Sequence, residues 1–541
     1  MQTVSEKWKS VQKKSLLNES FVEVSLDVAD PDALADASPS DNGAIYISDS
    51  SKLTNGVDKT PSRYCTLEQN LWLLNGSGQL PLESDTEDNG YVGDVLSDES
   101  CVFSSKIPTI TIEFSRFFTD PIPGITITWS DTHDEFADSF IVEAYVSPNR
   151  VITREIEGNR SVTSVVMMDI VDYHKIIIRV KKWCLPYHRA RVEKILVGVH
   201  KVYSKSNLIS YSHKQSVDPV STSLPKSEIA FAIDNTNNDY NPYNPQGMSR
   251  YLMERQEIKT RYGLKLNDGT IEWIKGGTFY LSEWEAKQNG MSADFKARDL
   301  LEFMSGIYYD TITEITERSL YDLATMVLES AKLPLNVDGT VKWIIDESLK
   351  EITTTAPLPE DTMANCLQLI ANAGECVIYQ DREGTLHIEP LPYDEDEPLP
   401  YEYEINSFNS YSKAELTLSK PVRRIRCNVY TYTIGDNGIE NTYVTHDYPE
   451  EDEEEDGKGE LITIDNPLIT SHGRASSVGK WLYSHLIQRM ALDLSWRPDV
   501  RLDALDIVTN PNDYTTNRVR MTEVEFKYNG AFRGTGKGKV I

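Results

Sequence analysis

The stretch FAIDNTNNDYNPYNPQGMSRYLMERQEIKTRYGLKLNDGTIEWIKGGTFYLSEWEAKQNGMSADFKARDLLEF, residues 231–303, alternates apolar and polar side chains in four segments. A period of two is typical of strands that bury one face. Gly263, Asp268-Gly269 and Asn289-Gly290 are predicted hairpin turns, because these residue types adopt positive φ at little cost. Residues 228–305 are therefore predicted to form a small antiparallel β-barrel.

The residues before this region also favour strands. Residues 1–63 are predicted to be an N-terminal arm, with a short amphipathic helix suited to a neighbouring subunit, followed by the strand FVEVSLDV. Residues 64–206 contain repeated strand patterns bounded by turn residues, which predicts a β-sandwich. Residues 207–227 are rich in Ser and Pro and fit either a linker or a strand that spans two domains. The strand patterns of the sandwich are NLWLL, TITIEFS, GITITWS, SFIVEAYV, SVVMMDI, HKIIIRV and EKILVGVHKVY.

The residues after this region change pattern twice. A helix is predicted after the cap Ser319, and a second helix from Met363 is ended by Gly374 and followed by a hairpin that turns at Arg382-Glu383-Gly384. Residues 306–400 are thus predicted to be an α/β domain. Residues 401–541 return to strands and are predicted to form a second barrel. It carries an acidic loop at 447–460 and a helix at 473–490. The fold class is mainly β with inserted α/β pieces, that is, α+β.

Composition restricts the function. The 541 residues suffice for three or four domains. Lys and Arg number 54 against 84 Asp and Glu, and the net charge of -30 disfavours nucleic-acid binding. The basic run Lys175 to Arg191 is interpreted as a strand with a charged outer face. Neither an export signal nor a run of about 18 apolar residues occurs, so no transmembrane segment is expected and the protein is expected to be made and kept in a cytoplasm.

No catalytic site is evident in the sequence. His174, His188 and His200 lack metal-ligand spacing, and the six cysteines contain no CxxC pair and are predicted to be buried free thiols. Gly276-Gly277 lies inside a strand pattern and indicates a bulge rather than a phosphate loop. The carboxylates Asp294, Asp299 and Glu283 cannot be distinguished without geometry. We therefore expect no enzyme, no cofactor and no metal, and we interpret the acidic loop as solvated, with a cation site or an interface contact as alternatives.

One motif within residues 231–303 resembles a pattern in tail-tip proteins of phages and prophages. Its pieces are Asp234-Asn235, Asp239 to Pro245, Gly277 to Trp284 and Ala297 to Leu301, in this order. Prolines fix φ and stiffen a loop, so the loop is predicted to be a subunit interface; a connection serving only its own fold is the alternative. The predicted interface residues are Asp239, Tyr240, Asn241, Pro242, Tyr243, Asn244 and Pro245.

Two later segments extend the resemblance. ANAGECVIYQDREGTLHIEPL (371–391) and WRPDVRLDALDIVTN (496–510) are similar to parts of the trimeric hub of contractile tails and type VI spikes. NLWLLNGSGQLPL (70–82), GYVGDVLSDE (90–99) and IPGITITWS (122–130) resemble a β-domain that often precedes the hub. The resemblance implies a homotrimeric structural virion protein, a tail-tip or baseplate hub that caps the tube. Such a hub anchors fibres or receptor-binding proteins during host attachment and genome delivery. Expected partners are distal tail or tube proteins, the tape-measure protein and fibres, with the protein located in the virion.

Two other functions stay open. A carbohydrate-binding receptor-recognition tail protein would use aromatic side chains of the sandwich, such as Trp72, Trp129 and Tyr145, to bind host cell-wall glycan. These residues lie in strand patterns where burial is expected. A lytic enzyme is the third possibility, and it lacks a recognisable nucleophile or carboxylate pair.

Overall fold

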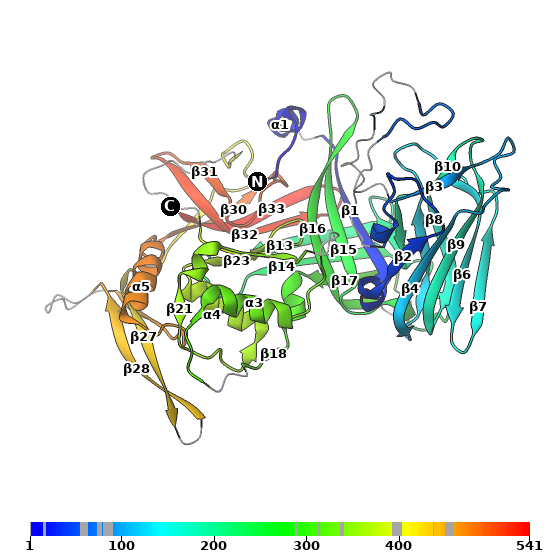
Figure 1. The fold of residues 1–541 in the computed structure, drawn as a ribbon. Coiled ribbons are helices and arrows are strands. Elements are labelled where there is room, and N and C mark those ends of the chain that lie inside the picture. Colours follow the sequence, from blue (N-terminus) through cyan, green and yellow to red (C-terminus); the bar gives the residue numbers. More distant parts are fainter. Residues whose placement is uncertain are drawn as a thin grey trace.

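The computed structural model describes residues 2–14, 18–54, 63–72, 78, 80, 90–286, 290–310, 314–335, 340–391, 403–435, 438–449 and 459–541. It confirms a mainly β fold with inserted α/β pieces. Figure 1 shows a β-sandwich at one end, a large sheet in the middle, a helical insertion against that sheet and a long hairpin arm at the opposite end. Residues 450–458 of the predicted acidic loop 447–460 lie outside the described residues, and both ends of the predicted range are strand: one strand ends at Tyr448 and another begins at Glu460.

The large sheet has thirteen strands drawn from both halves of the chain. β13 is central to it, because β13 pairs with β14 on one edge and with β32 on the other. Within segment 207–227, which was open between linker and strand, β13 accounts for residues 208–216, and residues 217–225 connect it to the next strand of the sheet, which begins at Lys226. The sheet order is β12 (Gly198–Tyr203), β1 (Ser20–Ala29), β15 (Glu257–Lys265), β16 (Ile271–Ala286), β17 (Ser292–Arg298), β14 (Lys226–Asp234), β13 (Leu208–Ser216), β32 (Thr516–Tyr528), β33 (Phe532–Val540), β30 (Met490–Trp496) and β26 (Glu415–Leu418), with β31 (Ile507–Pro511) on β32 and β25 (Tyr403–Glu404) on β31.

Two separate barrels are not what the described strands form. Most strands expected for the two barrels lie in this one sheet, whose order runs from β12 to β26 without returning to its start. The strands between residues 422 and 464, which were expected in the second barrel, form a separate three-stranded sheet. A closed barrel needs its last strand to pair with its first strand. Here β13, which extends the strands of the first region, pairs with β32 of the second region, so the edges needed for closure are occupied.

The expected turn at Gly263 is also wrong. Gly263 lies within β15 opposite Trp273, and a Cβ there would meet the Trp273 ring at 2.9 Å. Close packing of the ring, rather than a turn, selects glycine at this position. The turn at Gly269 and the bulge at Gly276 are confirmed, since Gly269 has φ +88 and the pairing of β15 with β16 skips Gly276. The third expected turn, Asn289-Gly290, has its Asn outside the described residues.

The sandwich packs a five-stranded sheet, β2-β4-β9-β6-β7, against the three-stranded sheet β11-β5-β8. Trp129, Phe140 and Trp183 join the two sheets, with ring centroids 4.8 Å apart for Trp129 and Phe140. The pattern NLWLL does not begin a strand, since Asn70 and Leu71 are in a turn, Trp72 is in no regular element, and residues 73–74 are not described. The strands are β2 (Ser38–Asp41), β3 (Tyr91–Leu96), β4 (Thr109–Phe118), β5 (Ile122–Thr128), β6 (Ala137–Val146), β7 (Arg150–Ile156), β8 (Thr163–Ile170), β9 (Tyr173–Trp183), β10 (Arg189–Val192), which pairs with β3, and β11 (Lys194–Leu196).

The insertion has the predicted order of helix, extended segment, helix and hairpin. Helix α3 (Leu320–Ser330) is capped by the Ser319 side chain, and α4 (Met363–Ala373) ends at Gly374, so both predicted helices are confirmed. The hairpin of β23 (Val377–Gln380) and β24 (Leu386–Glu389) turns at 381–385 as predicted, and β20 (Trp343–Ile345) lies parallel to β24. The short pairs are β18 (Ile307–Tyr308) with β22 (Asp361–Thr362), and β19 (Arg318–Ser319) with β21 (Thr353–Thr354).

The arm is a long hairpin of β27 (Val422–Gly435) and β28 (Gly438–Tyr448). At its base, β29 (Glu460–Ile464) runs parallel to β27, and α5 (His472–Leu486) covers one face. The helix predicted at 473–490 is therefore confirmed, four residues shorter at its end. The remaining helices are α1 (Glu6–Gln12), α2 (Pro31–Asp36) and the 3-10 turns η1 (Ser50–Lys52), η2 (Met248–Tyr251), η3 (Leu300–Met304) and η4 (Glu347–Lys350).

Helix α1 packs on its own chain. Trp8 and Val11 are 1% and 0% exposed in the core of the large sheet, and the Lys7 side chain pairs with Asp268 at 2.9 Å. The predicted amphipathic helix thus exists, with its apolar face on the β15–β16 hairpin side of the same molecule. No described helix is long and apolar enough to cross a membrane.

Arg382 fastens the insertion to the large sheet. It lies in the β23–β24 turn, and its Nε donates to Asp503 Oδ1 at 2.7 Å. Its Nη1 donates to the carbonyl of Lys275 at 2.8 Å, and its Nη2 donates to the carbonyls of Val500 and Leu502 at 2.8 and 3.2 Å. The side chain is 2% exposed, so these contacts replace water completely.

Replacing Arg382 by Met should lower the free energy of unfolding by about 3 kcal/mol, because three buried carbonyls and a carboxylate lose their donors. Urea unfolding of the full chain measures this change. Arg160→Met, at an exposed position, is the matched control and should stay within about 0.5 kcal/mol of the wild type. Equal midpoints for the two variants would contradict the role assigned to Arg382.

Candidate functional site

The predicted interface loop is a series of turns with a repeat of three residues. Asn238, Asn241, Asn244 and Gly247 each donate their backbone N–H to the carbonyl three residues earlier, at 2.8 to 3.2 Å. The prolines, at 242 and 245, occupy the second position of a turn, where their fixed φ is favourable. The side-chain oxygens of Asn241 and Asn244 accept the N–H two residues on. The loop is therefore ordered by its own backbone and amide contacts.

Tyr240 anchors this loop in the core. It is 5% exposed, its ring packs edge-on against Phe295 with centroids 5.2 Å apart, and its hydroxyl bonds the Tyr203 hydroxyl. Its backbone N–H donates to Asn235 Oδ1 at 2.9 Å. Burial raises the pKa of Tyr240 to about 12. Of the seven predicted interface residues, this one serves the fold of its own chain.

Tyr243 has the opposite environment. It is 77% exposed, and Pro242 and Pro245 beside it are exposed as well. An exposed aromatic ring on a backbone that is already ordered can be covered by a partner at low entropic cost. The predicted loop thus has a buried anchor, Tyr240, and a tip at 242–245 in which Pro242, Tyr243 and Pro245 are exposed. The turn contacts come from Asp239, Asn241 and Asn244.

The end of the loop contacts the sandwich. Arg250 in η2 pairs with Asp169 of β8 at 2.6 Å, and the Tyr251 hydroxyl donates to the other oxygen of Asp169 at 3.1 Å. The Arg250 guanidinium also lies 4.6 Å from the centre of the Tyr251 ring. The loop is therefore held at both ends, on the large sheet and on the sandwich.

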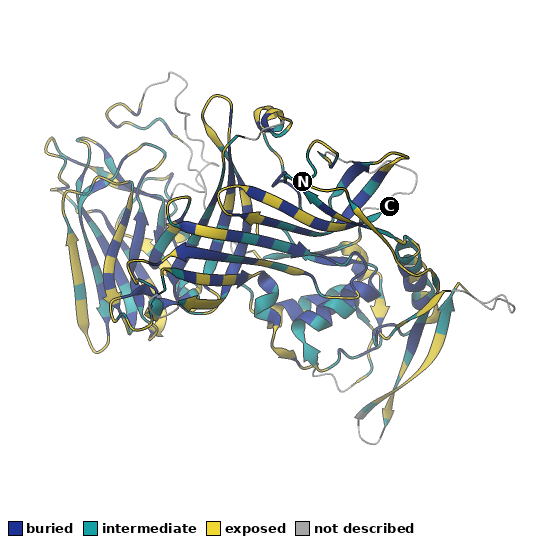
Figure 2. Ribbon diagram, turned by 180° about the vertical axis from the view of Figure 1, so that it is seen from behind, coloured by how far each residue is buried: buried dark blue, intermediate teal, exposed yellow. Residues whose placement is uncertain are grey.

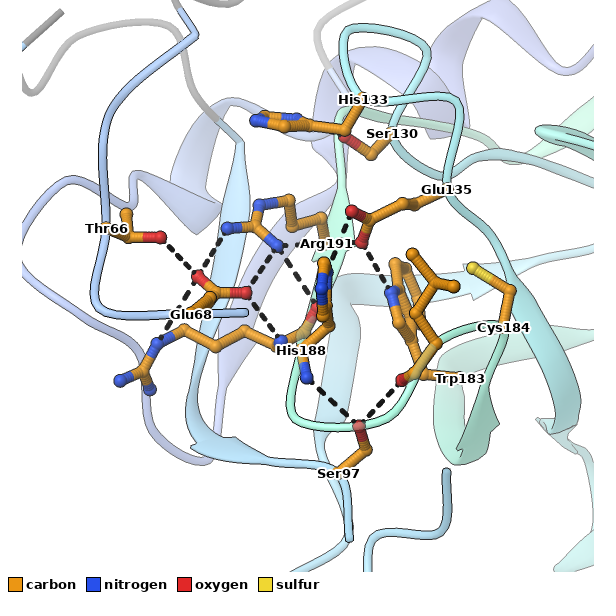
Figure 3. Close-up of polar contacts among 12 residues, drawn as sticks. Thr66, Glu68, Ser97, Ser130, His133, Glu135, Trp183, Cys184, His188 and Arg191 are labelled. Carbon is orange, nitrogen blue, oxygen red and sulfur yellow. Dashed lines mark hydrogen bonds and ion pairs between the residues drawn. The ribbon is translucent and has the colours of Figure 1, made fainter. Parts of the chain in front are cut away.

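A second cluster is buried inside the sandwich (Figure 3). Glu68 accepts two hydrogen bonds from the Arg191 guanidinium, at 2.8 and 2.5 Å, and one from the backbone of Arg189 at 2.8 Å. Thr66 donates to the same carboxylate at 2.8 Å. Burial alone would raise the pKa of Glu68, but the Arg191 charge and these hydrogen bonds bring it below its usual value. Glu68 therefore ties residues 63–72 to the strands of the sandwich.

Glu135 extends this cluster toward His188. It accepts from Trp183 Nε1 at 2.7 Å and lies 2.9 Å from His188 Nδ1. Burial lowers the pKa of His188, yet the Glu135 carboxylate outweighs burial and the net pKa is raised. Side chains of Glu135 and His188 are 3% and 4% exposed, so neither faces a space that a substrate could enter. His188 is thus a buried core histidine whose ring is paired with Glu135.

The other expected histidines have local partners. His200 Nδ1 lies 2.5 Å from Asp27 of the neighbouring strand β1, and the His174 ring packs against Phe117 at a tilt of 47°, with ring centroids 4.5 Å apart. No group of three or more His, Cys, Asp or Glu that could hold a metal ion occurs in the described part of the chain. All six cysteines are free, and three of them, Cys366, Cys376 and Cys427, are buried.

The basic run at 175–191 is neutralised within the sandwich. On the outer face of the five-stranded sheet, Lys175 pairs with Glu113 at 2.8 Å and Arg179 with Glu143 at 3.4 Å. The remaining pairs are Lys181 with Glu155, Lys182 with Asp138, and Arg189 and Arg191 with Glu68. Every Lys and Arg of the run has a carboxylate partner, so the run lacks the unpaired positive charge that binds phosphates.

Geometry singles out one carboxylate that the sequence could not. Asp299 is 4% exposed, accepts the N–H groups of Ser227 and Leu301 at 2.9 and 3.1 Å, and begins η3. Burial raises its pKa to about 7. It borders a cavity of about 390 Å³ between the large sheet and the insertion. The sequence alone did not separate Asp299 from the other carboxylates, because its burial depends on packing of the insertion, which the local sequence does not reveal.

That cavity is lined by groups that already have partners. Glu389 accepts from the Tyr379 hydroxyl at 2.6 Å, and Asp503 binds both Arg382 and the Gln2 side chain. Its lining combines acidic and basic side chains without a common charge. The loop tip at Pro242–Pro245 is therefore the better candidate for contact with another molecule.

The aromatic side chains considered for sugar binding are mostly not exposed. Trp129 is 0% exposed and donates to Ser164 Oγ, and Tyr145 is half-buried. Trp72 alone of the three is exposed, at 59%, beside residues that are not described. They do not form a shared platform.

No family model and no curated protein matches the chain. Among solved structures, the chain is similar to a 43 kDa prophage tail protein from Shewanella oneidensis, at 12% identity over 62% of this chain and 95% of that chain, with a TM-score of 0.41. It is similar to a tail protein from Neisseria meningitidis, at 10% identity over 63% and 94%, with a TM-score of 0.43. A prophage tail protein from Listeria monocytogenes shares 13% identity over 62% and 91%, with a TM-score of 0.37. With TM-scores below 0.5, the function proposed below rests on this chain's own residues.

Glu68→Gln should cost about 3–5 kcal/mol of unfolding free energy, because it leaves the Arg191 guanidinium buried without a counter-charge. Thermal and urea unfolding measure the loss, and the exposed Glu99→Gln serves as the control. A loss no larger than that of the control would show that the pair contributes little to the sandwich.

Asp299 predicts a pH dependence. The pKa of Asp299 is about 7 in the folded chain, against an ordinary value of 3.8. Between these two pH values the folded state therefore binds one more proton than the unfolded state. The free energy of unfolding should fall by up to ~1.4 kcal/mol per pH unit as the pH rises from about 4 to 7. Asp299→Asn should remove this slope, whereas the exposed Asp294→Asn should retain it. Urea unfolding at pH 5 and pH 7 compares the three proteins; parallel slopes would refute the assignment.

Proposed function

We propose that this chain is a structural subunit of a phage-type tail, a tail-tip or baseplate hub that caps the tube and anchors fibres or receptor-binding proteins. The observation that carries the proposal is the loop at 239–245, which combines the tail-tip sequence pattern with a rigid backbone and an exposed Tyr243. Tyr is among the residues most often found at the centre of protein interfaces.

The remaining contacts are consistent with a scaffold. Arg382 fastens the insertion to the large sheet, and Arg250 fastens the loop to the sandwich, so the three parts form one connected support. The proposed assembly is a homotrimer in the virion, in contact with distal tail or tube proteins, the tape-measure protein and fibres. Its proposed role is mechanical and not enzymatic. The sandwich at 64–206 and the α/β insertion at 306–400 remain proposed domains, whereas strands of the two expected barrel regions share the large sheet.

A receptor reader for host cell-wall glycan is less well supported. Its aromatic candidates are divided among a buried, a half-buried and an exposed position. Sugar rings bind to exposed aromatic faces that lie together with polar groups. No described observation favours this function over the hub.

Purified full chain should form an oligomer of three times the 61.3 kDa chain mass by light scattering. Tyr243→Ala should raise the concentration at which it dissociates roughly 30-fold, equivalent to about 2 kcal/mol at an interface centre. Tyr514→Ala, which alters a loop Tyr that is 97% exposed, is the control and should leave dissociation unchanged.

Microscopy of tail particles with this subunit labelled tests the location independently, and label at the tail tip is expected. A wild-type chain that stays monomeric at every concentration and is absent from tail particles would refute the proposed function.

A further inference from the structure

The last two strands of the chain bring two cations together. β32 and β33 are antiparallel neighbours in the large sheet, and their register sets Arg520 directly opposite Lys539. Side chains that face each other across neighbouring strands point to the same face of the sheet, and like charges in such a pair destabilise it. Most residues of β33 alternate between buried and exposed (Figure 2), so Lys537 lies on the same face as Lys539.

Segments from three parts of the chain enclose a small hollow around this pair. Its volume is about 20 Å³, and its walls come from the connection after β13, the end of α5 and strands β32 and β33. Figure 1 shows α5 between the arm and these strands. Asp218, His485, Arg520 and Lys539 are the ionisable side chains on its walls. A hollow of this size holds one water molecule or one small ion.

Lys539 is a partly buried cation without a close counter-charge. It makes no ion pair with any described residue, although burial lowers the pKa of its ammonium group and only the Asp218 charge opposes this shift. The cations of the run at 175–191, by contrast, all have carboxylate partners. Burying a charge without a partner is unfavourable, so the position of Lys539 calls for an anion.

Asp218 does not supply that anion, because its oxygens are already occupied. Its Oδ1 accepts the N–H of Val220 at 3.1 Å. Its Oδ2 accepts the N–H and the hydroxyl of Thr222 at 2.9 and 2.5 Å, and the N–H of Ser223 at 3.1 Å. This carboxylate therefore serves the turn that follows β13. Arg520 has a further contact elsewhere in the chain, so the charge that lacks a partner is that of Lys539.

His485 shows that the positive charges converge on one point. It lies near the end of α5, where its Nδ1 is 3.0 Å from the carbonyl oxygen of Trp481. Burial lowers the pKa of His485, and the charges of Arg520 and Lys539 lower it further. The Trp481 carbonyl and the Asp218 carboxylate oppose this shift without reversing it. The ring thus lies in an excess of positive charge, within a chain whose net charge is -30.

We propose that the hollow between the end of α5 and the β32–β33 pair binds one halide ion, held by Lys539 with Arg520 beside it. The ion would give Lys539 the counter-charge that the chain does not provide, and it would offset the repulsion between the two cations. Size selects this class of ligand, since a hollow that holds about one water-sized particle is too small for a phosphate or a sugar.

The ion would join segments that are far apart in the sequence. The connection after β13 leads to the first half of the large sheet, α5 covers the base of the arm, and β32 and β33 belong to the second half of the sheet. The ion is therefore expected to stabilise the attachment of α5 to the large sheet. This site goes beyond the role proposed above and does not depend on it.

Thermal unfolding of the full chain tests the site in solution. Sodium gluconate is replaced stepwise by sodium chloride at constant ionic strength, which keeps general screening of charges fixed. Gluconate is too large for the hollow. The wild-type midpoint should rise by roughly 2 °C and then level off, because an ion that binds only the folded state stabilises it until the site is full.

Lys539→Met removes the charge and keeps most of the apolar stem. In gluconate its midpoint should equal or exceed that of the wild type, because the repulsion with Arg520 is gone, and it should not rise in chloride. Lys537→Met, on the same strand and face with a side chain 59% exposed, is the matched control and should keep the chloride response. An equal loss of stability in both salts for Lys539→Met would mean a purely structural lysine and would overturn the site.

Bromide soaked into crystals of the full chain gives the position of the ion, because bromide scatters X-rays anomalously. A peak beside Lys539 Nζ is expected in the wild type and in Lys537→Met, and its loss is expected in Lys539→Met. A wild-type midpoint that does not respond to chloride, a missing wild-type peak, or a peak that persists in Lys539→Met would each refute the halide site and leave water as the occupant.

Discussion

The pairing of β13 with β32 is the constraint on which the rest of the fold depends. Six residue pairs from Tyr211–Tyr528 to Ser216–Glu523 join a strand near the middle of the chain to one near its end. Every neighbour then follows: β14 and β17 continue the sheet on one side, and β33 and β30 on the other. In the sequence, the insertion follows the strands of one half of this sheet and precedes the strands of the other half. It therefore packs where the two halves meet.

Buried ion pairs also hold separate segments of the chain together. A chain of net charge -30 repels itself, yet its buried cations are placed where they join separate segments. Arg382 joins the insertion to the large sheet, and Arg191 joins residues 63–72 to the sandwich. Buried ion pairs of this kind contribute little net stability compared with apolar packing, but losing one partner is costly. They therefore specify which segments meet.

Two surfaces remain for contact with other molecules, and they differ in construction. The tip at 242–245 is a compact turn series whose stiffness comes from proline and asparagine. The arm is a long hairpin whose strand β28 pairs only with β27 among the described strands and exposes Tyr443 and Val444. The first suits a small, well-defined contact and the second suits addition of a strand. Together they describe a subunit built for assembly, with its charged and ionisable groups largely satisfied inside the chain.

The sequence by itself determined most strands, the ends of the helices in the insertion and several turns. The period of two placed most strands, Ser319 and Gly374 marked helix ends, and the glycine at 384 marked a turn, because these signals act within a few residues. The proline loop at 239–245 was also recognisable. Only the tertiary structure decided that two expected barrels share one sheet, that Gly263 makes room for Trp273, and that Asp299 is buried with a raised pKa. Those outcomes depend on which distant strand occupies each free edge and on what covers each side chain, and neither is encoded in a local pattern.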